Sequence, residues 1–229
     1  MKSENNSFRI SFHLLKSLIA SLIIIVVPWI VFLIEQKFDT SFHVWGIYPR
    51  SVQGMPGIIF SVFIHGDIQH LLSNSLPLAL LSFFSLYFYP HAGWRAVLLI
   101  WLAGSLWTWL LGRPSYHIGA SGLIYGMAAF LVLSGWLSRY YRLIAVALLV
   151  IFLYGSLFWG IFPVQPDVSW EAHAMGVVAG LVAAWYFRHA LPQREIYDWE
   201  NEEDDNENSD NTEPPYWESN YTFPHNIQS

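Results

Sequence analysis

The sequence contains no cysteine and few charged residues, and each shortage excludes a class of protein. Without cysteine the chain cannot carry a disulfide framework, and it gives no indication of its redox compartment. Charged residues make up only 12% of the 229 residues, whereas a soluble domain averages about 25%. No His-Glu-x-x-His sequence occurs, so an intramembrane metalloprotease with that zinc-binding helix is not expected.

Long apolar runs take the place of the missing charge, and 54% of the residues are hydrophobic. A helix that crosses a bilayer needs about 20 mainly apolar residues. The first run is too long for the apolar part of a signal peptide and lacks a small-residue cleavage site after it, so we treat it as a span. We predict an all-α membrane protein with six transmembrane helices, at about 17–35, 68–89, 95–111, 121–137, 142–163 and 171–188.

The remaining segments divide the chain into three parts. Residues 1–16 form a cytoplasmic N-terminal segment, and 17–190 form the six-helix membrane domain. Within that domain, 36–67 is too long for a turn and too polar for a span, which indicates a loop in the outer interface. The tail at 191–229 contains eleven of the 17 acids and one base. This composition predicts a disordered, solvated extension, and binding to a partner is the alternative.

The basic residues indicate the orientation, because cytoplasmic loops carry an excess of lysine and arginine. With six spans and the N-terminus inside, eight bases lie on the inner side and three on the outer side. The inner bases are Lys2, Arg9, Lys16, Arg95, Arg139, Arg142, Arg188 and Arg194, and the outer ones are Lys37, Arg50 and Arg113. We therefore expect a multi-pass protein with both termini inside, an arrangement that suits a bacterial plasma membrane.

Four polar side chains occur near the outer ends of three spans: His70 and Asn74 in the second, Ser121 in the fourth and His173 in the sixth. Such groups are costly in a bilayer, so they usually face the bundle interior and mark function. From the helical rise, Ser121 and His173 lie at similar depths, roughly 27 and 22 Å above the arginines at the inner ends of their helices.

Glycines four residues apart predict that the fourth and sixth spans pack closely. The pairs are Gly122 with Gly126 and Gly176 with Gly180. Small residues at this spacing allow helix backbones to approach each other in lipid. Ser121 adjoins the first pair, and His173 lies on the same helix face as the second.

A serine hydroxyl close to a neutral histidine is the arrangement that nucleophilic catalysis requires. Ser121 would begin its helix, where its backbone N–H has no partner in the helix and could bind an oxyanion. His70 and Asn74 are four apart, so they project from one helix side and could add further donors. Taken one by one, these residues are also compatible with ordinary packing and structural hydrogen bonds.

Three motifs resemble those of the rhomboid intramembrane serine proteases, and they follow one another along the chain in the family's order, over about 55–190. The nucleophile motif Gly-x-Ser-Gly is present at 119–122, the His-x-x-x-Asn motif at 70–74, and a histidine followed by glycines at +3 and +7 at 173–180. Two further matches are Tyr125, a tyrosine that packs against the catalytic histidine in rhomboids, and His65, a histidine found in many members.

The resemblance implies a rhomboid-like bundle that cleaves membrane proteins within a transmembrane helix. Ser121 would be the nucleophile and His173 the general base and acid, without a third carboxylate. His70, Asn74 and the Ser121 amide would hold the oxyanion, with Gly119, Gly122, Tyr125, Gly126, Gly176, Gly180 and His65 in support. Three residues just before the fourth span, Ser115, Tyr116 and His117, would lie near the rim of a hydrated cavity. No cofactor, metal or nucleic acid is implied; the partners are substrate helices and the lipid bilayer.

The sequence departs from the family in two places. The Trp-Arg pair common in the first outer loop is replaced by residues near Gly57 and Ile58, while Trp94 and Arg95 lie at an inner helix end. Pro77 lies within the second span, where a proline can kink a helix.

Two other functions remain open. One is a catalytically inactive, rhomboid-like protein that binds membrane helices, although binding alone requires neither Ser121 nor His173. The other is a haem carrier with His70 and His173 as axial ligands, which would leave the nucleophile motif without a role.

Overall fold

The computed structural model describes residues 2–163 and 168–192, and this part of the chain contains helices and no strand. The all-α prediction is therefore confirmed for these residues. The α-helices are α1 (Lys2–Phe38), α2 (Gly57–Phe60), α3 (Ile68–Phe88), α4 (Gly93–Leu111), α5 (Ser121–Ser138), α6 (Tyr141–Tyr154) and α7 (Trp170–Tyr186). Short 3₁₀ segments are η1 (His43–Trp45), η2 (Val52–Gly54), η3 (Ser61–Phe63), η4 (Gly155–Ile161) and η5 (Arg188–Ala190).

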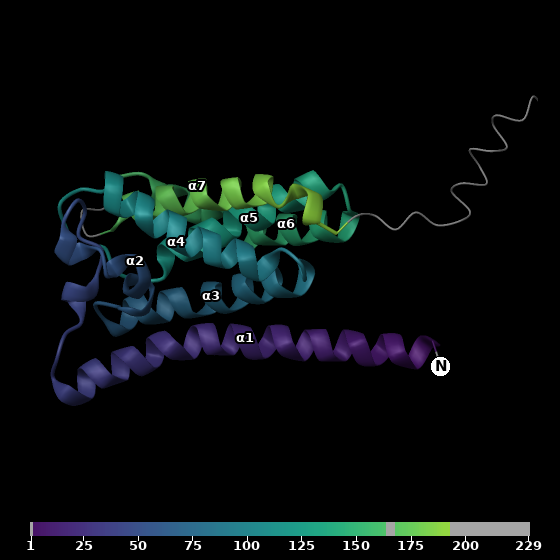
Figure 1. Ribbon diagram of the computed structural model, residues 1–229, viewed down its shortest axis with the longest axis horizontal. Helices are drawn as coiled ribbons and strands as arrows, with labels where there is room; N and C mark the ends of the chain where they lie inside the picture. Colours follow the sequence, from purple (N-terminus) through teal and green to yellow (C-terminus); the bar gives the residue numbers. More distant parts are fainter. Residues whose placement is uncertain (1, 164–167, 193–229) are drawn as a thin grey trace, which may run out of the picture. The chain divides into compact units, whose positions relative to one another are not determined.

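Helix α5 is central to the bundle and packs against α3, α4, α6 and α7 (Figure 1). Its middle turns contribute Met127, Phe130 and Leu131 to the core, and all three are fully buried. Helix α1 lies at one side of the bundle, where it runs along α3 (Figure 1). The indole N–H of Trp29 on α1 donates to Ser75 Oγ on α3 at 3.0 Å, which adds a polar contact to this apolar interface.

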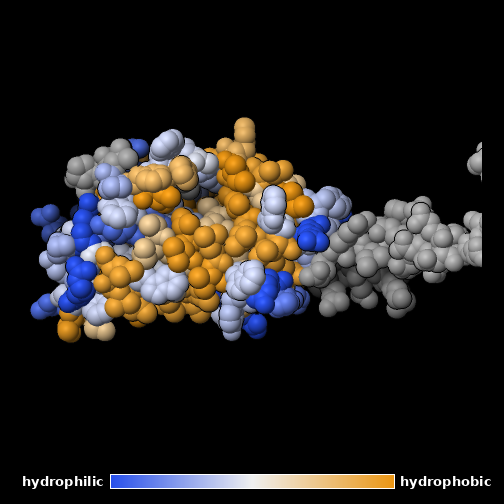
Figure 2. Space-filling model, turned by 90° about the horizontal axis from the view of Figure 1, so that it is seen from above, coloured by the Kyte–Doolittle hydropathy of each residue, from blue (hydrophilic) through white to orange (hydrophobic). Residues whose placement is uncertain are grey.

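Four helices in the described residues are long and apolar enough to cross a membrane: 12–38 of α1, then α3, α4 and α5. Helices α6 and α7 fall below that length, with 14 and 17 residues. The apolar surface agrees with a bilayer environment, because Figure 2 shows a broad hydrophobic zone between more hydrophilic ends of the face in view. The chain is an integral membrane protein by these features, and six spans remain a prediction.

The helix predicted at 142–163 differs from the observed one. The α-helix ends at Tyr154, and the chain continues as the 3₁₀ segment η4. Together they extend about 35 Å, from rises of 1.5 Å and about 2.0 Å per residue. The tighter segment matters for the site, because it brings the Gly160 carbonyl to His173.

The outer loop predicted at 36–67 begins later in the structure, because α1 continues to Phe38, and the rest consists of η1, η2, α2 and η3 joined by short turns. It is joined to the loop between α4 and α5 by a pair of backbone hydrogen bonds between Ile47 and His117, at 2.8 and 3.0 Å. At its end, the Asp67 carboxylate accepts from the His70 backbone N–H at 2.8 Å and so caps α3. At the other end of the chain, most of the predicted acidic tail lies outside the described residues.

Candidate active site

Ser121 is the first residue of α5, and the turn before it depends on Gly119. Gly119 has a positive φ of 102°, which residues with a side chain rarely adopt. A Cβ there would also lie 2.6 Å from the imidazole of His70. Ala120 provides no side-chain cap to the helix. The first backbone N–H groups of α5, including that of Ser121, therefore lack an intrahelical acceptor and a side-chain cap.

His173 lies in the first turn of α7, with both ring nitrogens hydrogen-bonded. Its Nδ1 is 2.8 Å from the Gly160 carbonyl oxygen, and its Nε2 is 2.8 Å from Ser121 Oγ. A carbonyl can only accept, so Nδ1 carries the proton in the neutral ring. The lone pair of Nε2 then accepts from the Ser121 hydroxyl, which is the orientation that a general base needs. With both nitrogens engaged in this way, the geometry does not favour His173 as a haem ligand.

The two helices that carry this pair are in backbone contact through their glycines. A Cβ on Gly176 would lie 2.0 Å from the Gly122 carbonyl oxygen, and one on Gly180 would lie 2.0 Å from that of Gly126. No side chain fits at such distances, so the spacing predicted from the sequence corresponds to a close crossing of α5 and α7. This crossing brings Ser121 and His173 together.

Asn74 and His70 face the same space from α3. The Asn74 side-chain amide donates to His65 Nε2 at 3.1 Å, which holds the amide in place and leaves its second N–H available. The His65 and His70 rings meet edge to face, with centroids 4.9 Å apart. His65 thus orients Asn74 from the outer loop, a contact that its position in the sequence did not reveal.

These groups line one cavity of about 520 Å³. Ser121, His173, His70 and Asn74 all contribute to it, and Tyr125 lies flat against His173 on its wall. The cavity is completed by residues that the sequence analysis did not select. They are Ser73 of α3 and, from the segments between the long helices, His43, Gly66, Asp67, Ile118, Val168 and Ser169. A cavity of this size can admit an extended peptide segment together with water.

The rim residues predicted before α5 divide into two groups. Tyr116 lines the cavity and contacts the rings of His43 and Tyr48, with centroids 5.0 Å apart in both pairs. Ser115 is not among the lining residues. The expectation for His117 is corrected, because its side chain is only 2% exposed and does not line the cavity of Ser121 and His173. Its backbone bonds to Ile47 place it inside the loop cluster.

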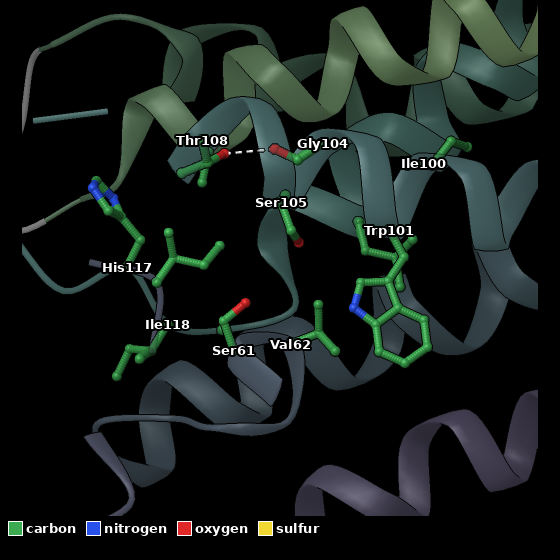
Figure 3. A pocket seen from close by; sticks show the side chains of 14 residues that line it. Ser61, Val62, Ile100, Trp101, Gly104, Ser105, Thr108, His117 and Ile118 are labelled. Atoms are coloured by element: carbon green, nitrogen blue, oxygen red, sulfur yellow. Dashed lines mark hydrogen bonds between the residues drawn. The ribbon is translucent and has the colours of Figure 1, made fainter. Parts of the chain in front are cut away.

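A second, much smaller cavity of about 20 Å³ lies between the loop before α5 and helix α4. Figure 3 shows Ser61, Ser105 and Trp101 around it, with the Thr108 hydroxyl bonded to the Gly104 carbonyl at 2.8 Å. Its volume and polar lining correspond to one water molecule. Tertiary packing alone produces this cavity, since its residues come from separate segments.

The comparison with known proteins agrees with these features. The family model for the Rhomboid domain matches residues 53–190. An uncharacterized protein of Mycobacterium tuberculosis is 39% identical over 176 residues, 72% of this chain and 72% of that protein. An uncharacterized protein of Mycobacterium leprae is 34% identical over 177 residues, 72% and 68% of the two chains. A protein of Acanthamoeba polyphaga mimivirus, provisionally named a rhomboid protein, is 28% identical over 130 residues, 54% and 70%. The chain therefore belongs to the rhomboid family.

Proposed function

We propose that the protein is an intramembrane serine endopeptidase that cleaves transmembrane segments of other membrane proteins. The observation that carries this proposal is the 2.8 Å hydrogen bond between Ser121 Oγ and His173 Nε2. A serine becomes nucleophilic when an adjacent base takes its proton, and a neutral imidazole is suited to that role near pH 7. The proton on Nδ1 is held by the Gly160 carbonyl, so a backbone group performs the orienting task that a carboxylate performs in a triad.

The reaction follows from this arrangement. Ser121 Oγ attacks the scissile carbonyl carbon while its proton moves to His173 Nε2, and a tetrahedral oxyanion forms. As the C–N bond breaks, His173 returns the proton to the leaving amine, which leaves an ester on Ser121. A water molecule, deprotonated by His173, then attacks the ester, and the hydroxyl of Ser121 is restored when the acid product departs.

The oxyanion would be held by donors from two helices. The Ser121 backbone N–H lies at the uncapped start of α5, where the helix dipole also favours negative charge. His70 and the second N–H of Asn74 approach from α3 and line the same cavity. Donors aimed at the developing charge are usually the largest single contribution to such catalysis.

The substrates are membrane proteins with a transmembrane helix, which must unwind locally before its backbone can enter the cavity. Six spans with both termini inside place the cavity on the outer side, where water reaches it. The apolar helices and the mycobacterial relatives agree with a bacterial plasma membrane as its location. Reporter fusions at the loops after α1 and α4 should give external signals, and a cytoplasmic signal at either position would contradict this topology.

The direct test is labelling with a fluorophosphonate probe in detergent-solubilised, full-length protein. We expect covalent labelling of Ser121 and none in Ser121→Ala. Ser138→Ala, which changes a serine at the other end of α5, should label as the wild type does. A wild-type protein that neither labels nor cleaves any single-span substrate would indicate the alternative, a catalytically inactive protein that binds membrane helices.

A further inference from the structure

His117 lies where three outer segments of the chain meet. It belongs to the loop between α4 and α5, and its backbone forms a two-bond bridge to Ile47 in the loop after α1. Its side chain reaches a third segment, the residues that lead into α7. With 2% of its surface exposed, the ring is enclosed by protein. Figure 3 shows it at one end of the small cavity, opposite Trp101.

Both nitrogens of the His117 ring have partners. Nε2 lies 3.1 Å from the Arg113 carbonyl oxygen, and Nδ1 lies 2.5 Å from Ser169 Oγ. A carbonyl only accepts, so Nε2 carries the proton and Nδ1 accepts from the serine hydroxyl. The neutral ring therefore satisfies both contacts. Burial lowers the pKa of His117, which favours the neutral ring. The hydrogen bond to the Arg113 carbonyl and the Glu171 carboxylate oppose that shift, and the Arg113 guanidinium adds to it.

The Ser169 side chain does not make the hydrogen bond that is expected at its position before a helix. Ser169 directly precedes α7, where a serine hydroxyl normally accepts from a backbone N–H of the first turn. Here the side chain makes no such capping bond, and its hydroxyl is directed to His117 instead. The Ser169 carbonyl accepts from the backbone N–H of His173 at 3.2 Å. Ser169 thus joins the His117 ring to the turn that carries His173.

The other end of the connection leads to the nucleophile. His117 precedes Ser121 by four residues, and the segment between them is held by the bond from the Gly119 N–H to the Ser61 carbonyl at 2.9 Å. The imidazole of His117 therefore links the loop that ends in Ser121 to the start of the helix that carries His173. Arg113 forms a second, more exposed link, since its side chain bonds the Val168 carbonyl at 2.9 Å and lies 3.5 Å from Glu171.

We infer that His117 is a positioning residue that sets the distance between Ser121 and His173 by holding Ser169 and the first turn of α7 against the nucleophile loop. This inference rests on the proposed protease function. His117 has no contact with substrate in this role. The rate of the chemical step should therefore depend on His117, whereas substrate binding should not. When His117 is replaced, Arg113 still joins the nucleophile loop to the start of α7, so only part of the activity should be lost.

The test is a double-mutant cycle on full-length protein in proteoliposomes, with kcat, KM and the rate of fluorophosphonate labelling as readouts. His117→Phe keeps a flat ring without hydrogen bonds, and Ser169→Ala removes the partner hydroxyl. Each should lower kcat and the labelling rate about tenfold, the effect of about one net hydrogen bond. KM should stay unchanged in His117→Phe, because His117, unlike Ser169, does not line the cavity of Ser121 and His173. The double variant should be no slower than either single one. His117→Asn, whose amide can reach Ser169, should recover most of the rate.

His91→Phe is the matched control, because His91 is an exposed histidine at the other end of the bundle. It should leave every readout at the wild-type value. The inference is overturned if His117→Phe matches the wild type, if the two single effects multiply, or if His117→Asn is as slow as His117→Phe. Should the Phe variant not fold, the Asn and Ser169→Ala variants decide the matter by the same readouts. Absence of labelling in the wild type would instead overturn the proposed function itself.

Discussion

The phenol ring of Tyr125 stacks on the imidazole of His173, with centroids 4.1 Å apart and planes within 7° of parallel. Tyr125 lies one turn after Ser121 on α5, so the helix that carries the proposed nucleophile also supports the face of the proposed base. The phenol oxygen approaches Gly160 so closely that a Cβ there would lie 1.8 Å from it. One side of His173 is thus held by an aromatic ring and its Nδ1 by the backbone beside that ring.

This stack predicts different results for two substitutions. Tyr125→Phe retains the ring and should keep kcat within about threefold of the wild type, whereas Tyr125→Ala removes it and should lower kcat at least about tenfold, because a misplaced base loses the near-attack geometry. Steady-state cleavage of a single-span substrate measures both. Equal activity of the Ala and Phe variants would contradict a role of the stack in orienting His173.

Loss of either member of the pair should abolish cleavage. Ser121→Ala removes the proposed nucleophile, and His173→Ala removes its proposed base, so each should leave no detectable product while the protein remains in the membrane. A gel assay with a tagged single-span substrate measures this, and Ser138→Ala is the control for α5. Residual cleavage by Ser121→Ala at the wild-type rate would refute the assignment.

Loss of one proposed oxyanion donor should reduce the cleavage rate less than loss of Ser121 or His173. Asn74→Ala removes one donor while others remain, and loss of one such donor costs on the order of 10²–10³ in rate. We expect kcat to fall by up to that factor with KM little changed. His65→Ala, which frees the Asn74 amide from its partner, should reduce kcat by a smaller factor. A variant at Asn74 as inactive as Ser121→Ala would contradict this ranking.

The glycine contacts between α5 and α7 predict a stability effect. Gly180→Ala places a methyl group 2.0 Å from a backbone oxygen of α5, so the helices must separate and the thermal midpoint should fall. Gly155→Ala is the matched control, because nothing lies within 4 Å of the added Cβ. Thermal unfolding in detergent compares the two. Similar midpoints for both variants would show that the crossing tolerates more space than the structure indicates.

His65, in the loop before α3, predicts a dependence of stability on pH. Burial and the nearby His70 lower the pKa of His65 from 6.5 to about 4. Between these values the unfolded chain takes up a proton that the folded protein does not, so the free energy of unfolding decreases as the pH falls from about 6.5 to about 4. The contribution of this one residue is on the order of 3 kcal/mol at 1.36 kcal/mol per pKa unit.

Denaturant unfolding in micelles at pH 7 and pH 4.5 measures this contribution. The wild type should lose more stability between the two than His65→Gln, whose side chain does not titrate. His91→Gln, at an exposed position, should lose as much as the wild type. Identical losses in wild type and His65→Gln would show that His65 is not the titrating group.

The family could be recognised from the sequence because its motifs are short, local and tied to helical spacing. Gly176 and Gly180 are four residues apart and must share a helix face, and Ser121 beside Gly122 must lie close to whatever that face packs against. The all-helical fold followed from apolar length. The number of spans is harder to predict from apolar length. Helix α6 continues as the 3₁₀ segment η4, and hydropathy does not distinguish such a segment from an α-helix.

The sequence by itself determined the apolar helices, their glycine faces and the polar groups near the ends of three of them, because each depends on spacing within one helix. Only the tertiary structure decided which other groups hold these polar side chains in position. The Gly160 carbonyl that holds His173 is a backbone atom, which every residue possesses, so no residue type indicates it. His117 meets Ser169 from 52 residues away, and no periodicity relates the two. Such contacts arise only when loops from separate helices are brought to the same end of the bundle.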